Sequence, residues 1–143
     1  MKKLIIISLV SFILIFSAIP VYAAETAKLS TESDIAPQFT AIWSMGAGLS
    51  IDSWGKAICS GFVTPQSNSY SSELTVSLQK STGSGWSTIK SWSESGVGFA
   101  GVIIEGHHYV ASGTYRVCST AKIYNSSGTL LETESFYSAE RTY

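Results

Sequence analysis

The sequence predicts an all-β fold, a small antiparallel β-sandwich that follows an N-terminal signal peptide. Beyond the first two dozen residues, apolar and polar side chains alternate with a period of two, and no window repeats apolar residues at helical spacing over three turns. Clusters of glycine, serine and asparagine separate the alternating segments. Six to eight short strands with frequent turns in about a hundred residues are typical of a sandwich.

The N-terminus has the pattern of a secretory signal peptide. Lys2 and Lys3 precede an apolar stretch over residues 4–19, and small residues then mark a cleavage site before Ala24. The alternative is an uncleaved membrane anchor, but this stretch is shorter than the roughly 20 residues that span a bilayer. We therefore expect cleavage of residues 1–23, secretion, and no membrane attachment afterwards.

The rest of the chain divides into a short lead-in and one domain. Residues 24–37 lack hydrophobic periodicity and end at a proline, so we interpret them as a flexible segment before a domain at residues 38–143. Only 13% of the 143 residues are charged and the net charge is −1. This balance excludes a coiled coil, a disordered acidic tail and a basic protein that binds nucleic acid.

Five segments of the domain show the strand alternation most clearly. In residues 73–80, Leu74, Val76 and Leu78 point to one face and polar side chains to the other. The other four segments are residues 56–64, 86–92, 115–124 and 129–137. Residues 81–85 and 125–128 are rich in serine, asparagine and glycine, which predicts hairpin loops there.

The segment Gly113-Thr114-Tyr115 is similar to the tyrosine corner of immunoglobulin-like sandwiches, so the predicted architecture is immunoglobulin-like in general terms. We expect Tyr115 to be buried, with its hydroxyl bonded to the backbone near residues 109–111. Cys118 lies three residues after the tyrosine, whereas the immunoglobulin cysteine lies two after it. Cys118 therefore faces the opposite side of its strand, and immunoglobulin homology is not supported.

A resemblance covers most of the chain after the signal peptide. A tryptophan after a turn is followed by a second one six residues later, and G-x-Y-R-V and G-x-x-x-E motifs come after them. The residues concerned are Leu78-Gln79-Lys80, Gly85-Trp86, Ser91-Trp92-Ser93, Gly113 to Val117, Gly128 and Glu132. This pattern resembles a family of small secreted proteins of Gram-positive bacteria, catalogued as a domain of unknown function. The resemblance implies a secreted β-sandwich and supplies no catalytic residues.

The two cysteines, Cys59 and Cys118, leave two alternatives open. An even number of cysteines in an exported domain favours a disulfide, which would add about 4 kcal/mol of stability in the chain-entropy model. Against it, the opposite strand face at Cys118 could direct the two thiols apart.

No motif of the sequence predicts a metal site or a cofactor. Glu105, His107 and His108 are the only cluster of ligand types, but adjacent histidines on a strand point to opposite faces, and zinc needs three or four ligands. The glycine-rich string at residues 96–101 fits G-x-G-x-x-G, yet an apolar β-like run follows it instead of a helix.

No motif predicts catalysis either. Four S-x-x-K matches in a serine-rich chain are a chance pattern, because serine–lysine enzymes place that pair on a helix. A Ser-His-Asp triad would have to use Asp34 or Asp52, without any supporting signature. We expect a protein that is not an enzyme.

The aromatic residues are the strongest candidates for ligand contact. Trp86 and Trp92 have even spacing on a predicted strand, so we expect their rings to share one face, and Trp54 falls in a predicted loop. Exposed rings in a row can stack against sugars. The alternative is that Trp43, Trp86 and Trp92 fill the core.

These observations predict an exported, non-enzymatic β-sandwich that engages the cell envelope or an extracellular partner, either a protein or a cell-envelope glycan. The first alternative is a carbohydrate-binding module that uses exposed tryptophan or tyrosine rings. The second is a secreted hydrolase or metal protein that uses His107 or His108. A third, an antimicrobial or toxin-like protein, fits the small size alone.

Overall fold

The structure is a computed structural model that describes residues 39–143. The predicted signal peptide and the predicted flexible segment at residues 24–37 lie outside the described residues. Within residues 39–143, no helix is long and apolar enough to cross a membrane.

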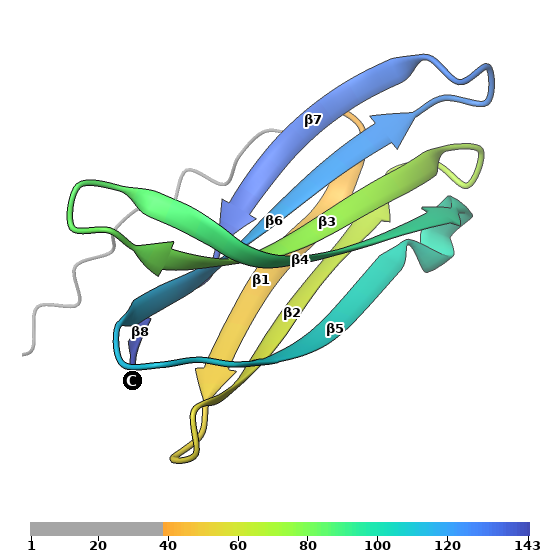
Figure 1. Cartoon of the computed structure of the whole chain (residues 1–143). Coiled ribbons are helices and arrows are strands. Elements are labelled where there is room, and N and C mark those ends of the chain that lie inside the picture. The colour runs from red at the N-terminus through yellow and green to blue at the C-terminus, as the bar shows by residue number, and fades with distance from the viewer. Residues whose placement is uncertain (1–38) are drawn as a thin grey trace, which may run out of the picture. The chain divides into compact units, whose positions relative to one another are not determined.

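The described chain forms two antiparallel sheets packed face to face (Figure 1). One sheet has three strands in the order β1-β2-β5. The other has the order β4-β3-β6-β7, and β8 pairs with the beginning of β6. The strands are β1 (Ile42–Ile51), β2 (Lys56–Pro65), β3 (Ser71–Ser81), β4 (Trp86–Val97), β5 (Val102–Tyr109), β6 (Thr114–Tyr124), β7 (Leu130–Tyr137) and β8 (Arg141–Thr142). Because the only helical element of residues 39–143 is the 3-10 turn Gly98–Ala100, the predicted β-sandwich is confirmed.

The core lies between the sheets and follows the predicted alternation. Leu74, Val76 and Leu78 of β3 are fully buried, as their spacing predicts. On β6 the inward set is Tyr115, Val117, Ser119, Ala121 and Ile123. Burial of these side chains supplies the main free energy that holds the two sheets together.

Two glycines allow the sheets to approach closely. A Cβ atom at Gly61 of β2 would collide with the Ser119 side chain of β6 and with Val76 of β3. A Cβ atom at Gly106 of β5 would collide with the ring of Trp92. The absence of a side chain at these two positions therefore sets the local spacing of the sandwich.

The chain crosses from β5 to β6 through the predicted tyrosine corner. Tyr115 is 1% exposed, and its hydroxyl donates a hydrogen bond to the Ala111 carbonyl at 2.6 Å. The carbonyl lies in the connection between the strands, where no ladder partner exists for it. The expectation for Tyr115 is confirmed.

A carboxylate of β7 binds the backbone at the beginning of β1. The Glu132 carboxylate accepts hydrogen bonds from the backbone N–H groups of Thr40, Ala41 and Ile42, at 3.0, 2.7 and 2.9 Å. These N–H groups come just before or at the start of β1, so the carboxylate replaces the partners that a neighbouring strand would supply. Glu132 is the last residue of the G-x-x-x-E motif noted in the sequence.

Candidate functional site

The two cysteines lie on different sheets and point in different directions. Cys59 of β2 is fully buried between the sheets. Cys118 of β6 follows the outward phase of its strand, beside Thr120, whose Oγ1 lies 3.7 Å from the Cys118 Sγ. Both are free cysteines in this structure. The sequence left open whether the two cysteines form a disulfide. Such a bond would require β2 or β6 to rotate about its own axis, so that both thiols point to the same side.

Thiol reactivity gives a first testable prediction. Burial raises the pKa of the Cys59 thiol to about 11, so it stays protonated at pH 7–9. We expect iodoacetamide to label Cys118 slowly in the native protein and Cys59 only after unfolding. Mass spectrometry of peptides, with and without denaturant, measures both rates. Equal labelling of the two native cysteines, or the recovery of a disulfide-linked peptide, would contradict this arrangement.

The histidines diverge, as adjacent positions on a strand predict. His107 faces outward from the three-stranded sheet, and its Nε2 lies 3.2 Å from the Glu105 Oε1. His108 pairs with Ala57, which is fully buried, so its side chain leaves from the opposite face of β5. Residues 39–143 contain no group of three or more metal-ligating side chains. No hydroxyl of these residues is hydrogen-bonded to His107.

Asp52, a triad candidate in the sequence, has a local structural role. Its Oδ1 accepts hydrogen bonds from the backbone N–H groups of Trp54 and Lys56, at 2.8 and 2.9 Å, within the β1–β2 turn. The other candidate, Asp34, lies outside the described residues.

The prediction that Trp86 and Trp92 share a face is wrong. β4 pairs with β3 through a register shift between Leu78 and Gln79, and one extra residue of β4, Ile89, occupies this bulge. The bulge reverses the alternation along β4. As a result, Trp92 points inward and covers Gly106, whereas Trp86 points outward.

Trp43 does not lie in the core, where one alternative of the sequence analysis placed it. A second register shift lies between Ile42 and Ser44 of β1, and Trp43 is 75% exposed. Trp54, in the β1–β2 turn, is 82% exposed, so its ring is available to a partner. Neither ring forms a row with Trp86 or Trp92.

The outer face of the five-stranded sheet holds a different cluster, centred on Arg116 of β6. Its guanidinium lies 4.2 Å from the ring centre of Trp86 and also 4.2 Å from that of Tyr137. The Arg116 Nε donates a hydrogen bond to the Gln79 Oε1 at 2.9 Å. One residue from each of β4, β3, β6 and β7 therefore meets at this cluster, which we call the arginine stack.

The arginine stack holds a cation without a paired anion. No carboxylate of residues 39–143 lies within 4.0 Å of the Arg116 guanidinium. Since Nε is the only nitrogen with a hydrogen-bond partner among the described residues, the two Nη groups keep their donors. The arrangement is a preformed fork for a carboxylate or a phosphate group.

Pairs of hydroxyl groups lie beside the arginine stack, on the same outer face of the five-stranded sheet. Three pairs bridge neighbouring strands, each at 2.9 Å: Thr75 with Ser93, Ser77 with Ser91, and Thr120 with Ser135. A hydroxyl group can donate one hydrogen bond and accept two, so each pair still offers acceptors to a ligand. The result is a polar surface next to the Arg116 guanidinium.

Sequence reasoning missed Arg116, Gln79 and Tyr137 as site residues. They are far apart in the sequence, and only the pairing of β3 with β6 and of β6 with β7 brings them together. The one available signal was that Arg116 occupies an outward position between apolar neighbours.

The sequence matches no known family model, and no curated protein is similar to it at a significant level. The resemblance to a secreted family of Gram-positive bacteria therefore stays a prediction, and the candidate site is argued from its geometry alone.

Proposed function

We propose that this chain is an exported, non-enzymatic protein that binds an acidic glycan of the cell envelope through the outer face of its five-stranded sheet. The observation that supports the proposal most is the arginine stack, a cation held between two aromatic rings with free donors and no carboxylate partner among residues 39–143.

The stack suits an anionic group because the guanidinium is already ordered. Trp86 and Tyr137 hold its plane from both sides, and Gln79 fixes its rotation through Nε. Less side-chain entropy is then lost when the Nη groups bind two oxygens of one carboxylate or phosphate. Such charge-assisted hydrogen bonds are about twice as strong as neutral ones.

The surroundings suit a sugar. Tyr137 is 49% exposed, so part of its ring is open to a ligand, and sugar rings stack on aromatic faces. The hydroxyl pairs on β3, β4, β6 and β7 match the many donors and acceptors that a sugar carries. An acidic polysaccharide combines both requirements, because it presents anions and hydroxyl groups together along one chain.

Two further observations support the remaining parts of the proposal. The pattern at residues 1–23 is that of an export signal. The candidate catalytic groups do not converge among residues 39–143: Asp52 is bound within a turn, and His107 contacts only Glu105. Both observations favour binding outside the cell over a hydrolase.

The test is calorimetric titration of residues 24–143 with three polymers: a polyuronate, a phosphate-bearing wall polymer and a neutral glucan. We expect binding to one or both acidic polymers, weaker at higher salt, and none to the neutral one. Arg116→Gln removes the fork and should weaken binding about 10–100-fold, the loss expected for charge-assisted hydrogen bonds.

Arg141→Gln is the matched control, because it removes the same charge from β8, outside the arginine stack. We expect the dissociation constant of this variant to stay within about twofold of the wild-type value, because only the long-range effect of the charge is lost. Arg116→Lys, which keeps the charge but not the planar fork, should behave like Arg116→Gln. No binding to either acidic polymer, or equal binding by the Arg116→Gln variant, would overturn the proposal.

A further inference from the structure

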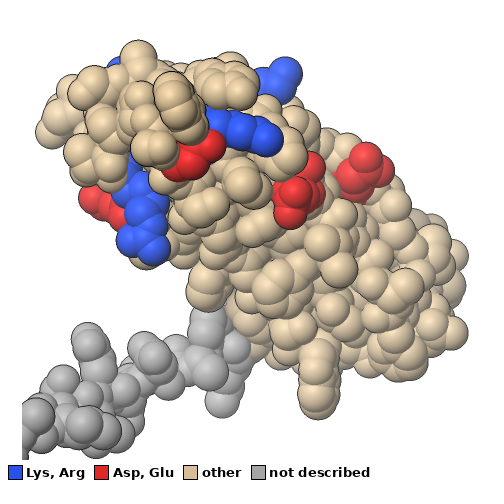
Figure 2. Space-filling view, turned by 90° about the horizontal axis from the view of Figure 1, so that it is seen from below, with Lys and Arg blue, Asp and Glu red and all other residues tan. Residues whose placement is uncertain are grey.

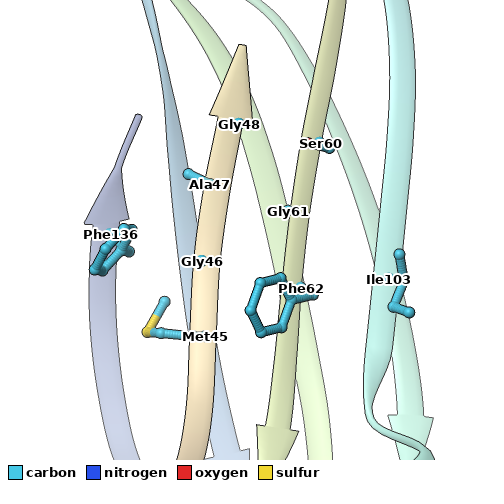
Figure 3. A pocket seen from close by; sticks show the side chains of 9 residues that line it. All are labelled: Met45, Gly46, Ala47, Gly48, Ser60, Gly61, Phe62, Ile103 and Phe136. Atoms are coloured by element: carbon cyan, nitrogen blue, oxygen red, sulfur yellow. The ribbon is translucent and has the colours of Figure 1, made fainter. Parts of the chain in front are cut away.

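β5 is a free edge of the three-stranded sheet, which lies on the side of the molecule seen in Figure 2. In the order β1-β2-β5 it pairs with β2 alone, and Figure 3 shows this order through Gly46, Phe62 and Ile103, one residue of each strand. The backbone groups on the other side of β5 therefore have no neighbouring strand. Such an edge is a template for another chain unless the protein protects it.

β5 lacks the features that protect the other edges of the two sheets. The ladders of the edge strands β1, β4 and β7 each contain a register shift, which disrupts an edge locally. The β2–β5 ladder runs through eight residue pairs without one. β5 also contains no proline or lysine, two residues that commonly protect an edge. It is thus the most regular edge of residues 39–143.

The hydrogen-bond pattern shows which residues of β5 are free to bind. The Val110 N–H donates to the Gly55 carbonyl at 2.8 Å, and antiparallel neighbours alternate between bonded and non-bonded pairs. In the register of the β2–β5 ladder, Ile104 and Gly106 therefore bond to β2. The N–H and C=O groups of the alternate residues point to the free edge and have no hydrogen-bond partner among residues 39–143; these residues are Ile103, Glu105, His107 and Tyr109.

A groove of about 410 Å³ runs along this edge, between β5 and β4. The consecutive residues 101–105 line it, together with Trp92, Glu94 and Ser95 of β4. Since alternate side chains of a strand point to opposite faces, consecutive residues line one groove only where it follows the edge of the strand. The unpaired backbone groups of β5 therefore border a space that is open to another chain.

The chemistry of the edge selects an extended, basic polypeptide. Donors and acceptors recur at every second residue, about 6.6 Å apart, which is the repeat of an extended polypeptide. Glu94 and Glu105 both line the groove, and no lysine or arginine of residues 39–143 does. Acidic side chains are exposed on this side of the molecule (Figure 2). Opposite charges on neighbouring strands stabilise their pairing, so basic side chains suit this edge.

We infer that β5 binds an extended segment of another protein, with basic side chains at alternate positions, as an added strand of the three-stranded sheet. The backbone of the segment pairs with Ile103, Glu105 and His107, and its basic side chains lie beside Glu105 on the outer face. The side chains between them face the groove and Trp92. The added strand also covers part of the Ile103 side chain, which is 78% exposed.

Two other occupants of the edge have the wrong charge. Residues 24–37 of this chain carry three acidic side chains and one lysine. A second copy of β5 would bring another Glu105 to the acidic groove and no lysine or arginine with it. Like charges on neighbouring strands destabilise their pairing, so both occupants are disfavoured.

The first experiment is calorimetric titration of residues 24–143 with a peptide of alternating lysine and valine. A peptide of about seven residues nearly matches the length of β5. We expect a dissociation constant of about 10–100 μM, and at least about tenfold weaker binding when glutamate replaces lysine. Methylation of the lysine backbone nitrogens, which donate to β5, should abolish binding. Methylation of the valine backbone nitrogens should change the dissociation constant less than about threefold.

Glu105→Lys reverses the charge at the edge. The Glu105 side chain is 64% exposed, so circular dichroism should show a folded variant. We expect it to bind the lysine peptide at least about tenfold more weakly than the wild type, and the glutamate peptide more tightly. Glu134→Lys, the same change at an exposed position of β7, is the matched control. It should leave both dissociation constants within about twofold of the wild-type values.

Amide hydrogen exchange, followed by NMR, tests the backbone pairing directly. In the free protein, the amides of Ile103, Glu105 and His107 should exchange fast, and those of Ile104 and Gly106 slowly. The lysine peptide should slow the exchange of the first three amides at least about tenfold.

Slow exchange of these three amides in the free protein would mean that another part of this chain or a second copy already covers the edge, and would overturn the inference. So would the absence of lysine-peptide binding up to about 1 mM, or equal binding of the lysine and glutamate peptides. Equal effects of the two methylations, or the reverse order, would overturn it as well. None of these outcomes depends on glycan binding.

Discussion

Tyr115→Ala should lower the free energy of unfolding by about 3–5 kcal/mol, the largest loss that we expect from a single substitution. The side chain is 1% exposed and belongs to the core between the two sheets. Its removal leaves a cavity, and it also leaves the Ala111 carbonyl without the hydroxyl that donates to it at 2.6 Å. Urea denaturation of the wild type and the variant measures the difference.

Tyr115→Phe separates the two contributions. It keeps the ring and removes only the hydrogen bond, so it should lower the free energy of unfolding by about 1–3 kcal/mol. A Tyr115→Ala protein as stable as the wild type would mean that the corner is not part of the folded domain. In that case Tyr115 would become a candidate for ligand contact.

Glu132→Ala should have the second largest effect, a loss of about 2–4 kcal/mol in the free energy of unfolding. Three backbone N–H groups, those of Thr40, Ala41 and Ile42, donate to its carboxylate. Ile42 is 1% exposed, so water is a poor substitute for this partner there. We also expect faster amide hydrogen exchange at these three positions, which can be measured by mass spectrometry.

Glu134→Ala is the matched control, because the Glu134 side chain is exposed on the same strand and forms no hydrogen bond with another described residue. Its effect on the free energy of unfolding should stay within about 0.5 kcal/mol. Equal effects of the two substitutions would show that the carboxylate of Glu132 does not hold the beginning of β1.

The local pattern of side chains determined most of the fold by itself. Alternation has a period of two in any strand, so the inward sides of residues 73–80 and 115–124 follow from composition alone. The same alternation placed Cys118 on the outward face of its strand. The tyrosine corner was predictable too, because its glycine, tyrosine and backbone acceptor lie within five residues of one another.

Only the tertiary structure decided where the tryptophans point. The bulge at Ile89 reverses the alternation between Trp86 and Trp92, and it exists because β4 pairs with β3 in a shifted register. Nothing in residues 86–92 taken alone signals an extra residue. The bulge after Ile42 has the same consequence for Trp43, which lies outside the core.

Of the features described above, the arginine stack is the one that the sequence alone predicts least. Gln79, Trp86, Arg116 and Tyr137 belong to four different strands and span nearly sixty residues of the chain. Each of them alone is an unremarkable outward residue. They form a site because strand pairing, a long-range interaction, aligns them in one row of the sheet. The alternation of each strand determined which side chains face outward, and the register between the strands decided which of those side chains meet.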